Sequence, residues 1–128
     1  MPALGPISPF FIVSDVPEAI SFYQERLGFE LRYSEPAEHP FFAIVGRDSA
    51  QIFLKSISAE ITAQPNHTRH EWAPWDAFVY ADDPDSFAKE FASRGLTFYK
   101  ELVNRNDGVR GFEVADPDGY VLFFGRPI

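Results

Sequence analysis

Side chains that could do chemistry fall into two groups along the sequence. His67 and His70 lie three residues apart in a polar stretch, where two imidazoles could share a metal ion. A solvated loop also accounts for this pair, and we favour it because no further ligand is clearly placed beside them. Asp76, Tyr80 and Tyr99 could act as an acid/base set if the fold brings them to one cleft, which the sequence alone does not decide.

Other polar residues have simpler structural interpretations. Arg110 and Glu113 lie on one predicted strand, where either could contact a ligand, but we favour an exposed ion pair. Asp15 and Asp82 are interpreted as helix N-caps rather than as catalytic acids. The sequence has no glycine-rich phosphate loop and no nucleophile elbow. It also has no cysteine, which excludes disulfides, thiolate nucleophiles and zinc–thiolate sites.

Composition predicts one globular domain. The chain has 128 residues, of which 45% are hydrophobic and 23% charged, with an aromatic content of 16%. This high aromatic content indicates either a core rich in aromatic side chains or an aromatic-lined cavity. The net charge of −8 argues against nucleic acid as a partner and is compatible with a cationic ligand, although it also serves solubility. No signal-peptide pattern or membrane-length apolar run occurs, so we expect a cytoplasmic protein that does not contact a membrane.

An internal repeat organises these residues. Two apolar strands, at 11–13 and 78–80, each lead through an Asp and a Pro into an amphipathic pattern that predicts a helix. Gly28 and Gly95 follow as C-terminal caps, at equal distances from Asp15 and Asp82. Three strand-like runs follow each helix, at 29–34, 41–45 and 51–56 and at 96–102, 108–114 and 120–124. Matching signals in matching order indicate a duplicated unit.

The repeat predicts an α+β fold of two βαβββ modules. The modules span about residues 7–57 and 75–127, and a linker at 58–74 joins them within a single domain. Asp-Pro-Asp-Gly at 116–119 predicts a tight turn before the last strand, because Pro presets φ and Gly tolerates positive φ. Neither sheet is covered by its own helix on both faces, so we expect the modules to combine around one cleft.

The repeat and its motifs resemble one protein superfamily. Val-Ser-Asp at 13–15, Phe-Tyr at 22–23, Leu-Gly-Phe at 27–29 and the 116–119 turn resemble the glyoxalase/bleomycin resistance/extradiol dioxygenase superfamily, the vicinal oxygen chelate fold. The resemblance covers nearly the whole chain in the correct order. It implies that the two modules form a curved mixed sheet around a cleft, with the helices on the outer face.

The resemblance also implies where a metal would bind. Enzymes of the superfamily hold a divalent metal at four strand positions, which correspond here to Ser8, Phe53, Asp76 and Phe123, with Trp75 as the alternative to Asp76. Two phenyl rings and a hydroxyl replace the nitrogen or carboxylate ligands that such a metal needs. We therefore expect no metal and no cofactor.

Strand alternation assigns the remaining residues to two faces. The residues that share a face with those four positions, together with Trp75 at one end, form the expected ligand-binding cleft. Its members are Ser8, Phe10, Phe53, Trp75, Asp76, Phe78, Tyr80 and Phe123. The opposite parity should pack under the helices and comprises Phe11, Val13, Ile52, Leu54, Val79, Leu122 and Phe124. A cleft of this kind suits a flat aromatic ligand. The alternative is that the rings only fill space left by a missing metal site.

In lacking these metal ligands, the sequence resembles the metal-free bleomycin resistance branch of the superfamily. Pro9 lies six residues before Asp15, as does a proline associated in that branch with strand exchange between subunits, so a homodimer with N-terminal strand exchange is expected. Gly-Val-Arg at 108–110 stands where that branch has a tryptophan, which argues against bleomycin itself. The leading hypothesis is metal-free sequestration of an aromatic, cationic small molecule, as in antibiotic resistance. The alternatives are a lyase, isomerase or dioxygenase with an atypical site, and a non-catalytic interaction module.

Overall fold

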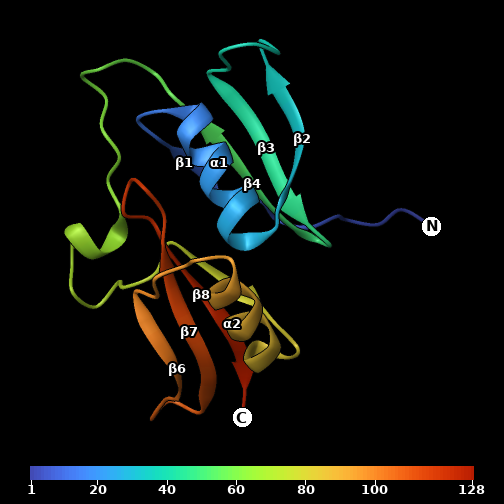
Figure 1. Ribbon diagram of the computed structural model, residues 1–128, viewed down its shortest axis with the longest axis vertical. Coiled ribbons are helices and arrows are strands. Elements are labelled where there is room, and N and C mark those ends of the chain that lie inside the picture. Colours follow the sequence, from blue (N-terminus) through green and yellow to red (C-terminus); the bar gives the residue numbers. More distant parts are fainter. The chain divides into compact units, whose positions relative to one another are not determined.

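The chain folds as two compact units. A computed structural model describes all residues from 1 to 128, and they separate into Met1–Ala63 and Gln64–Ile128 (Figure 1). Each unit contains one helix and one four-stranded mixed sheet, so the predicted pair of βαβββ modules is confirmed. The division falls within the segment predicted as a linker. No helix is both long enough and apolar enough to cross a membrane.

The first unit builds its sheet from four short strands. In chain order it contains β1 (Phe10–Ile12), α1 (Val16–Leu27), β2 (Glu30–Glu35), β3 (Phe42–Arg47) and β4 (Ala50–Lys55). The strand order across the sheet is β1-β4-β3-β2, with β1 parallel to β4 and the other neighbours antiparallel. The parallel pair requires a crossover, and α1 opens the connection that provides it.

Helix α1 begins and ends where the sequence predicts. The Asp15 side chain accepts a hydrogen bond of 3.0 Å from the backbone N–H of Glu18, and Gly28 adopts the left-handed conformation at φ 67°. The buried helix positions pack over one face of the sheet, and they are Val16, Ala19, Ile20, Tyr23 and Leu27. Phe11, Ile52 and Leu54 are buried on the strands, as alternation predicts.

The second unit repeats the arrangement. It contains β5 (Ala77–Tyr80), α2 (Pro84–Ser93), β6 (Lys100–Asn104), β7 (Val109–Ala115) and β8 (Val121–Pro127), in the sheet order β5-β8-β7-β6. Under α2 the core is mainly aromatic. Phe112 and Phe124 stack at 5.4 Å, and Phe91 from the helix meets both rings edge-on. All three rings are buried, which fixes this face of the sheet as the core of the unit.

The N-cap of α2 differs from the prediction by one residue. Asp83, not Asp82, caps the helix, because its carboxylate accepts from the backbone N–H of Ser86 at 3.2 Å and from the Ser86 hydroxyl at 2.7 Å. Pro84 occupies the first helical position, where its missing N–H costs nothing. The sequence did not reveal this shift, because Gly28 and Gly95 are equally far from Asp15 and Asp82. The helices themselves differ in length, since α1 has 12 residues and α2 has 10.

The ends of two other segments also differ from the prediction. The run at 96–102 is strand only from Lys100, because Leu96 closes α2 by donating its N–H to Phe91 O at 3.0 Å. The linker contains a short 3₁₀ helix, η1 (Asn66–Thr68), and its second half belongs to the second unit. The turn at 116–119 is confirmed: Asp116 Oδ1 accepts from the N–H groups of Asp118 and Tyr120, each at 2.9 Å.

Candidate functional site

Strand pairing establishes which residues of the two units are equivalent. Phe10 on β1 lies opposite Phe53 on β4, and Phe78 on β5 lies opposite Phe123 on β8. Ser8 stands two residues before Phe10, and Asp76 stands two residues before Phe78. The register therefore makes Asp76, rather than Trp75, the equivalent of Ser8. All of these positions belong to the sheet face opposite the helix, which we call the helix-free face of each unit.

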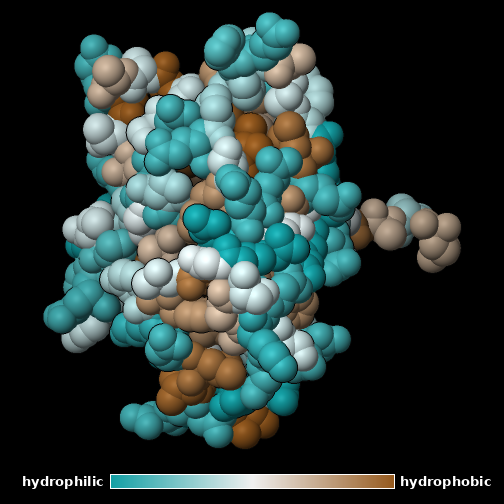
Figure 2. Space-filling view, in the orientation of Figure 1, coloured by the Kyte–Doolittle hydropathy of each residue, from teal (hydrophilic) through white to brown (hydrophobic).

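Aromatic rings gather on the helix-free face of the first unit. Phe42 meets Phe53 edge-on at 5.7 Å, and Phe10 lies 6.3 Å from Phe42 and 6.1 Å from Phe53. Tyr33 extends the group from β2, 6.1 Å from Phe42. Phe10 is 57% exposed, so the group is not a closed core. Exposed hydrophobic side chains are visible on both units in Figure 2.

Polar and charged groups border this aromatic group. Gln51 donates its side-chain N–H to Ser8 Oγ at 3.3 Å, and Arg32 Nη1 donates to the side-chain Oε1 of Gln51 at 3.3 Å. Lys55 places its ammonium 4.1 Å from the Phe41 ring centroid, a cation–π contact. The first unit therefore offers a ring surface with amide and hydroxyl groups at its edge.

The second unit has a tighter aromatic group on its helix-free face. Trp75 lies 4.3 Å from Phe123 and 6.0 Å from Phe78, while Phe78 and Phe123 stack at 5.4 Å. Phe123 is only 1% exposed, whereas Phe78 and Tyr80 are 46% and 65% exposed. Phe123 thus forms the base of the group, and the neighbouring rings carry its accessible surface.

Two glycines allow the Phe123 ring to lie directly against the strands of the sheet. Gly111 and Gly125 pair across β7 and β8, and a Cβ atom on either would fall 2.6 or 2.5 Å from the nearest atom of the Phe123 ring. Such distances are not tolerated, so the ring requires glycine beneath it. The glycine pair is therefore a packing requirement of the aromatic group.

Asp76 is held by backbone amides. Its Oδ1 accepts from the N–H of Asn66 at 2.8 Å, and its Oδ2 accepts from the N–H of Val121 at 2.8 Å. These bonds tie the linker and the start of β8 to the start of β5. Neither Tyr80 nor Tyr99, the other members of the hypothetical acid/base set, is hydrogen-bonded to this carboxylate. Tyr99 packs beside His67, with ring centroids 5.9 Å apart.

The positions used by metalloenzymes of this fold do not fit a divalent metal in this chain. Phe53 and Phe123 offer only carbon, Asp76 has both oxygens engaged, and Ser8 accepts from a neighbouring amide. No group of three or more His, Cys, Asp or Glu side chains converges anywhere in the structure.

The two linker histidines make separate backbone contacts. His67 places Nε2 at 2.8 Å from the carbonyl oxygen of Gly119, which lies in the turn before β8. His70 accepts through Nδ1 from the backbone N–H of Trp72 at 3.0 Å. These contacts fix the loop that leads to β5, and they give the His67–His70 pair a structural explanation.

The predicted ion pair between Arg110 and Glu113 is wrong. These residues are three apart on β7, so their side chains lie on opposite faces of the sheet. Arg110 makes two bonds of 2.8 Å to Asp85 of α2, and these bonds hold the pKa of that carboxyl below its usual value. Glu113 is instead buried, 2% exposed, on the helix-free face, where it lies opposite Phe123. Alternation along β7 was the signal that could have identified it.

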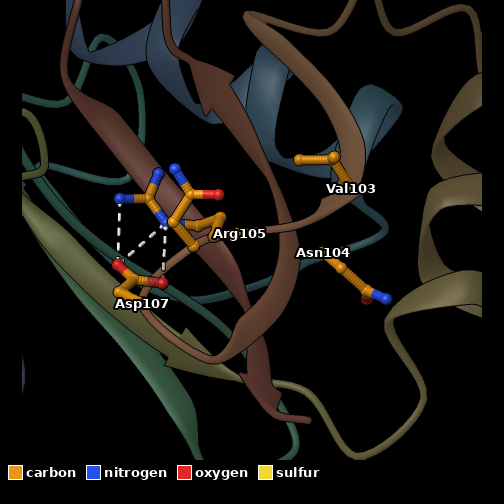
Figure 3. Close-up of a pocket in the computed structure, with 5 residues that line it drawn as sticks. Val103, Asn104, Arg105 and Asp107 are labelled. Carbon is orange, nitrogen blue, oxygen red and sulfur yellow. Dashed lines mark hydrogen bonds and ion pairs between the residues drawn. The ribbon is translucent and has the colours of Figure 1, made fainter.

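Arg105 lies over this buried acid and the adjoining rings. Its guanidinium is 4.9 Å from the Trp75 ring and 5.6 Å from the Phe123 ring, and Nη1 is 3.7 Å from Glu113 Oε2. Arg105 also lines an open hollow of about 400 Å³ formed by residues 103–107 between β6 and β7. Figure 3 shows Arg105 and Asp107 pointing toward each other within it.

Several solved structures share this architecture. TioX from Micromonospora sp. ML1 is 18% identical, with 97% of this chain and 100% of that chain covered and a TM-score of 0.73. TnmS3, an antibiotic binding protein from Streptomyces sp. CB03234, is 24% identical over 100% of both chains, with a TM-score of 0.70.

A third structure and the family model complete the comparison. The bleomycin-binding protein of Streptomyces verticillus, solved with copper(II)-bleomycin, is 25% identical with a TM-score of 0.68, and the match covers 97% of this chain and 96% of that chain. No curated protein matches significantly. The family model matches residues 4–124, and the chain therefore belongs to the Glyoxalase/Bleomycin resistance protein/Dioxygenase superfamily.

Proposed function

We propose that this protein binds an aromatic, cationic small molecule on its helix-free faces without metal chemistry. The observation that carries the proposal is the replacement of metal-ligand positions by accessible aromatic groups. In each unit a ring lies at the last-strand position, Phe53 or Phe123, and a more exposed ring, Phe10 or Phe78, lies beside it. An aromatic ligand is the partner that such surfaces favour.

The expected interactions are large enough for useful affinity. Each ring pair contributes about 0.5–1.5 kcal/mol beyond area burial, and a cation over a ring contributes about as much. The net charge of −8 attracts a cationic ligand at long range. The antibiotic and bleomycin binding named for two similar structures supports the same class of function, although this chain's Gly-Val-Arg at 108–110 leads us to expect a ligand other than bleomycin.

We further propose that the protein acts as a homodimer in the cytoplasm. Residues 1–7 are exposed along their whole length and include the apolar side chains of Met1, Leu4 and Ile7. Exchange of this segment between two copies would cover those side chains. Light scattering should give the mass of a dimer, and a chain lacking residues 1–7 should dimerise more weakly. A monomer at micromolar concentration would contradict this part of the proposal.

Calorimetry and thermal shift with defined probes test the binding function. We would use 9-aminoacridine as a planar cation and copper(II)-bleomycin as a comparison compound. Phe10→Ala and Phe78→Ala each remove an exposed ring, and each should weaken 9-aminoacridine binding about tenfold or less, as expected for one ring pair. Phe22→Ala is the matched control, because Phe22 lies on α1, away from the helix-free face. Absence of 9-aminoacridine binding, or equal losses in all three variants, would contradict the proposal.

A further inference from the structure

We propose that Glu113 is the polar anchor of the ligand site in the second unit. In this role its carboxylate receives an ammonium or other charged N–H donor that an aromatic ligand carries on a short arm. The inference rests on the proposed function and specifies the chemistry of its ligand. It concerns a residue outside the four positions at which metalloenzymes of the fold hold their metal.

Glu113 is buried, and one of its two carboxylate oxygens has no hydrogen-bond partner. The residue is 2% exposed, and Oε1 is buried without any hydrogen-bond partner. Oε2 has one charged neighbour, Arg105 Nη1 at 3.7 Å, which is beyond hydrogen-bond distance. A buried carboxylate that lacks close partners is costly, so its unsatisfied oxygen calls for a partner such as a water, an ion or a ligand.

Arg105 neutralises Glu113 only in part, because its closest contacts go to another acid. Its Nε lies 3.2 and 3.1 Å from the two carboxylate oxygens of Asp107, and its Nη2 lies 3.0 Å from Asp107 Oδ2. One cation is therefore shared by two carboxylates, and the closer contacts all go to Asp107. Lys100, which faces Glu113 across the strands, is exposed. The group of Arg105, Asp107 and Glu113 carries a net charge of −1 that a ligand cation would balance.

A second unpaired polar atom lies in the same aromatic group. Trp75 Nε1 is buried and has no hydrogen-bond partner, and the Trp75 ring packs against Phe123, the residue opposite Glu113, with ring centroids 4.3 Å apart. One donor and one acceptor are thus left open beside a surface of rings. Apolar lining with a few convergent polar groups is the usual composition of a small-molecule site.

The position of Arg105 indicates how a ligand would reach Glu113. The guanidinium lies over Trp75 and Phe123 and forms part of the wall of the hollow at 103–107 (Figure 3). A ligand cation that entered from this hollow would take the place of the guanidinium above the rings. Because the bonds to Asp107 hold Arg105 on its other side, the guanidinium could withdraw from Glu113 and keep its main partner.

Two probes that differ only in charge test the anchor. We would titrate the whole protein with 2-naphthylmethylamine and with 2-naphthylmethanol, which share a ring system and differ in the ammonium or hydroxyl on the arm. A hydrogen bond to a buried charge predicts about tenfold tighter binding of the amine. Glu113→Gln should remove this preference and leave the affinity for the alcohol unchanged. Glu101→Gln removes an equal charge from an exposed position on β6 and should keep the preference.

The possible results separate the anchor from the proposed function. If both probes bind wild-type protein equally, the anchor is refuted and the aromatic site stands. If neither probe binds, the proposed function fails and the anchor fails with it. Persistence of the amine preference in Glu113→Gln also refutes the anchor. Glu113→Met is a second variant of similar length, and failure of both variants to fold would identify Glu113 as a structural partner of Arg105 instead.

Discussion

The role of Asp76 can be tested most sharply, because the sequence and the structure suggest different roles for it. Its place in the resembling family predicts a residue of the ligand-binding cleft. In the structure, both of its carboxylate oxygens accept backbone N–H groups, from Asn66 and from Val121, at 2.8 Å each. We therefore expect Asp76→Asn to act on stability rather than on ligand binding.

The magnitude follows from the number of bonds that the substitution breaks. An asparagine keeps one oxygen, so one of the two bonds survives, and its amide group faces a backbone N–H as a second donor. Loss of one hydrogen bond to a charged group costs about 1.5–3 kcal/mol, which corresponds to several degrees in Tm for a domain of this size. Asp76→Ala breaks both bonds and should cost more than Asp76→Asn.

Urea unfolding and amide hydrogen exchange together measure this effect. Asp76→Asn should lower the free energy of unfolding, and protection should fall most at the amides of Asn66 and Val121. Asp82→Asn is the control, because it removes the same charge from an exposed position that caps no helix. Unchanged stability and unchanged protection, with weaker binding of 9-aminoacridine, would refute the structural role and restore Asp76 to the ligand site.

Two further substitutions test the packing and electrostatics of the second unit. Gly111→Ala should destabilise the protein by about 1–3 kcal/mol in urea unfolding, because its Cβ would lie 2.2 Å from Phe124 O. Gly5→Ala, with open space around it, is the control, and equal stability of the two variants would contradict the packing argument. Ser86→Ala should raise the pKa of Asp83 toward its ordinary value, since the Ser86 hydroxyl bond lowers that pKa most. The contribution of the Asp83 cap to stability is present above the unfolded pKa of Asp83, and it is lost as the pH falls through the lowered folded pKa. An NMR titration that finds the same pKa for Asp83 in wild-type protein and in Ser86→Ala would contradict this prediction.

Local sequence signals predicted the modules well because each signal depends on neighbouring residues. Asp15 and Gly28 bound α1 as expected, since capping depends on a few adjacent backbone groups. Alternation also assigned Leu54 and Phe124 correctly to the faces under the helices. The cap of α2 was misplaced because spacing between motifs cannot detect a helix that is two residues shorter. Strand pairing, a long-range feature, makes Asp83 the equivalent of Asp15, in agreement with the bonds of Asp83 to Ser86.

The polar part of the site could not be predicted because it depends on tertiary partners. Asp76 looked like a free acid, yet Asn66, ten residues earlier, and Val121, 45 residues later, occupy its oxygens. Glu113 looked like an exposed residue paired with Arg110, since surface pairs are the common arrangement for such side chains. Alternation along β7 places Glu113 on the face opposite Arg110, but its burial depends on neighbours such as Phe123 and Arg105, which come from other parts of the chain.

The structure shows how the second unit accommodates an aromatic ring at the position of Phe123. A phenyl ring at Phe123 is larger than a carboxylate, and it is accommodated because Gly111 and Gly125 leave space beneath it. The acid of this region then lies on the neighbouring strand, since Glu113 pairs directly with Phe123 across β7 and β8. There Glu113 belongs to no group of three or more acids or histidines that could hold a metal. Its position beside stacked rings and a shared arginine is the reason that we propose an organic cation as its ligand.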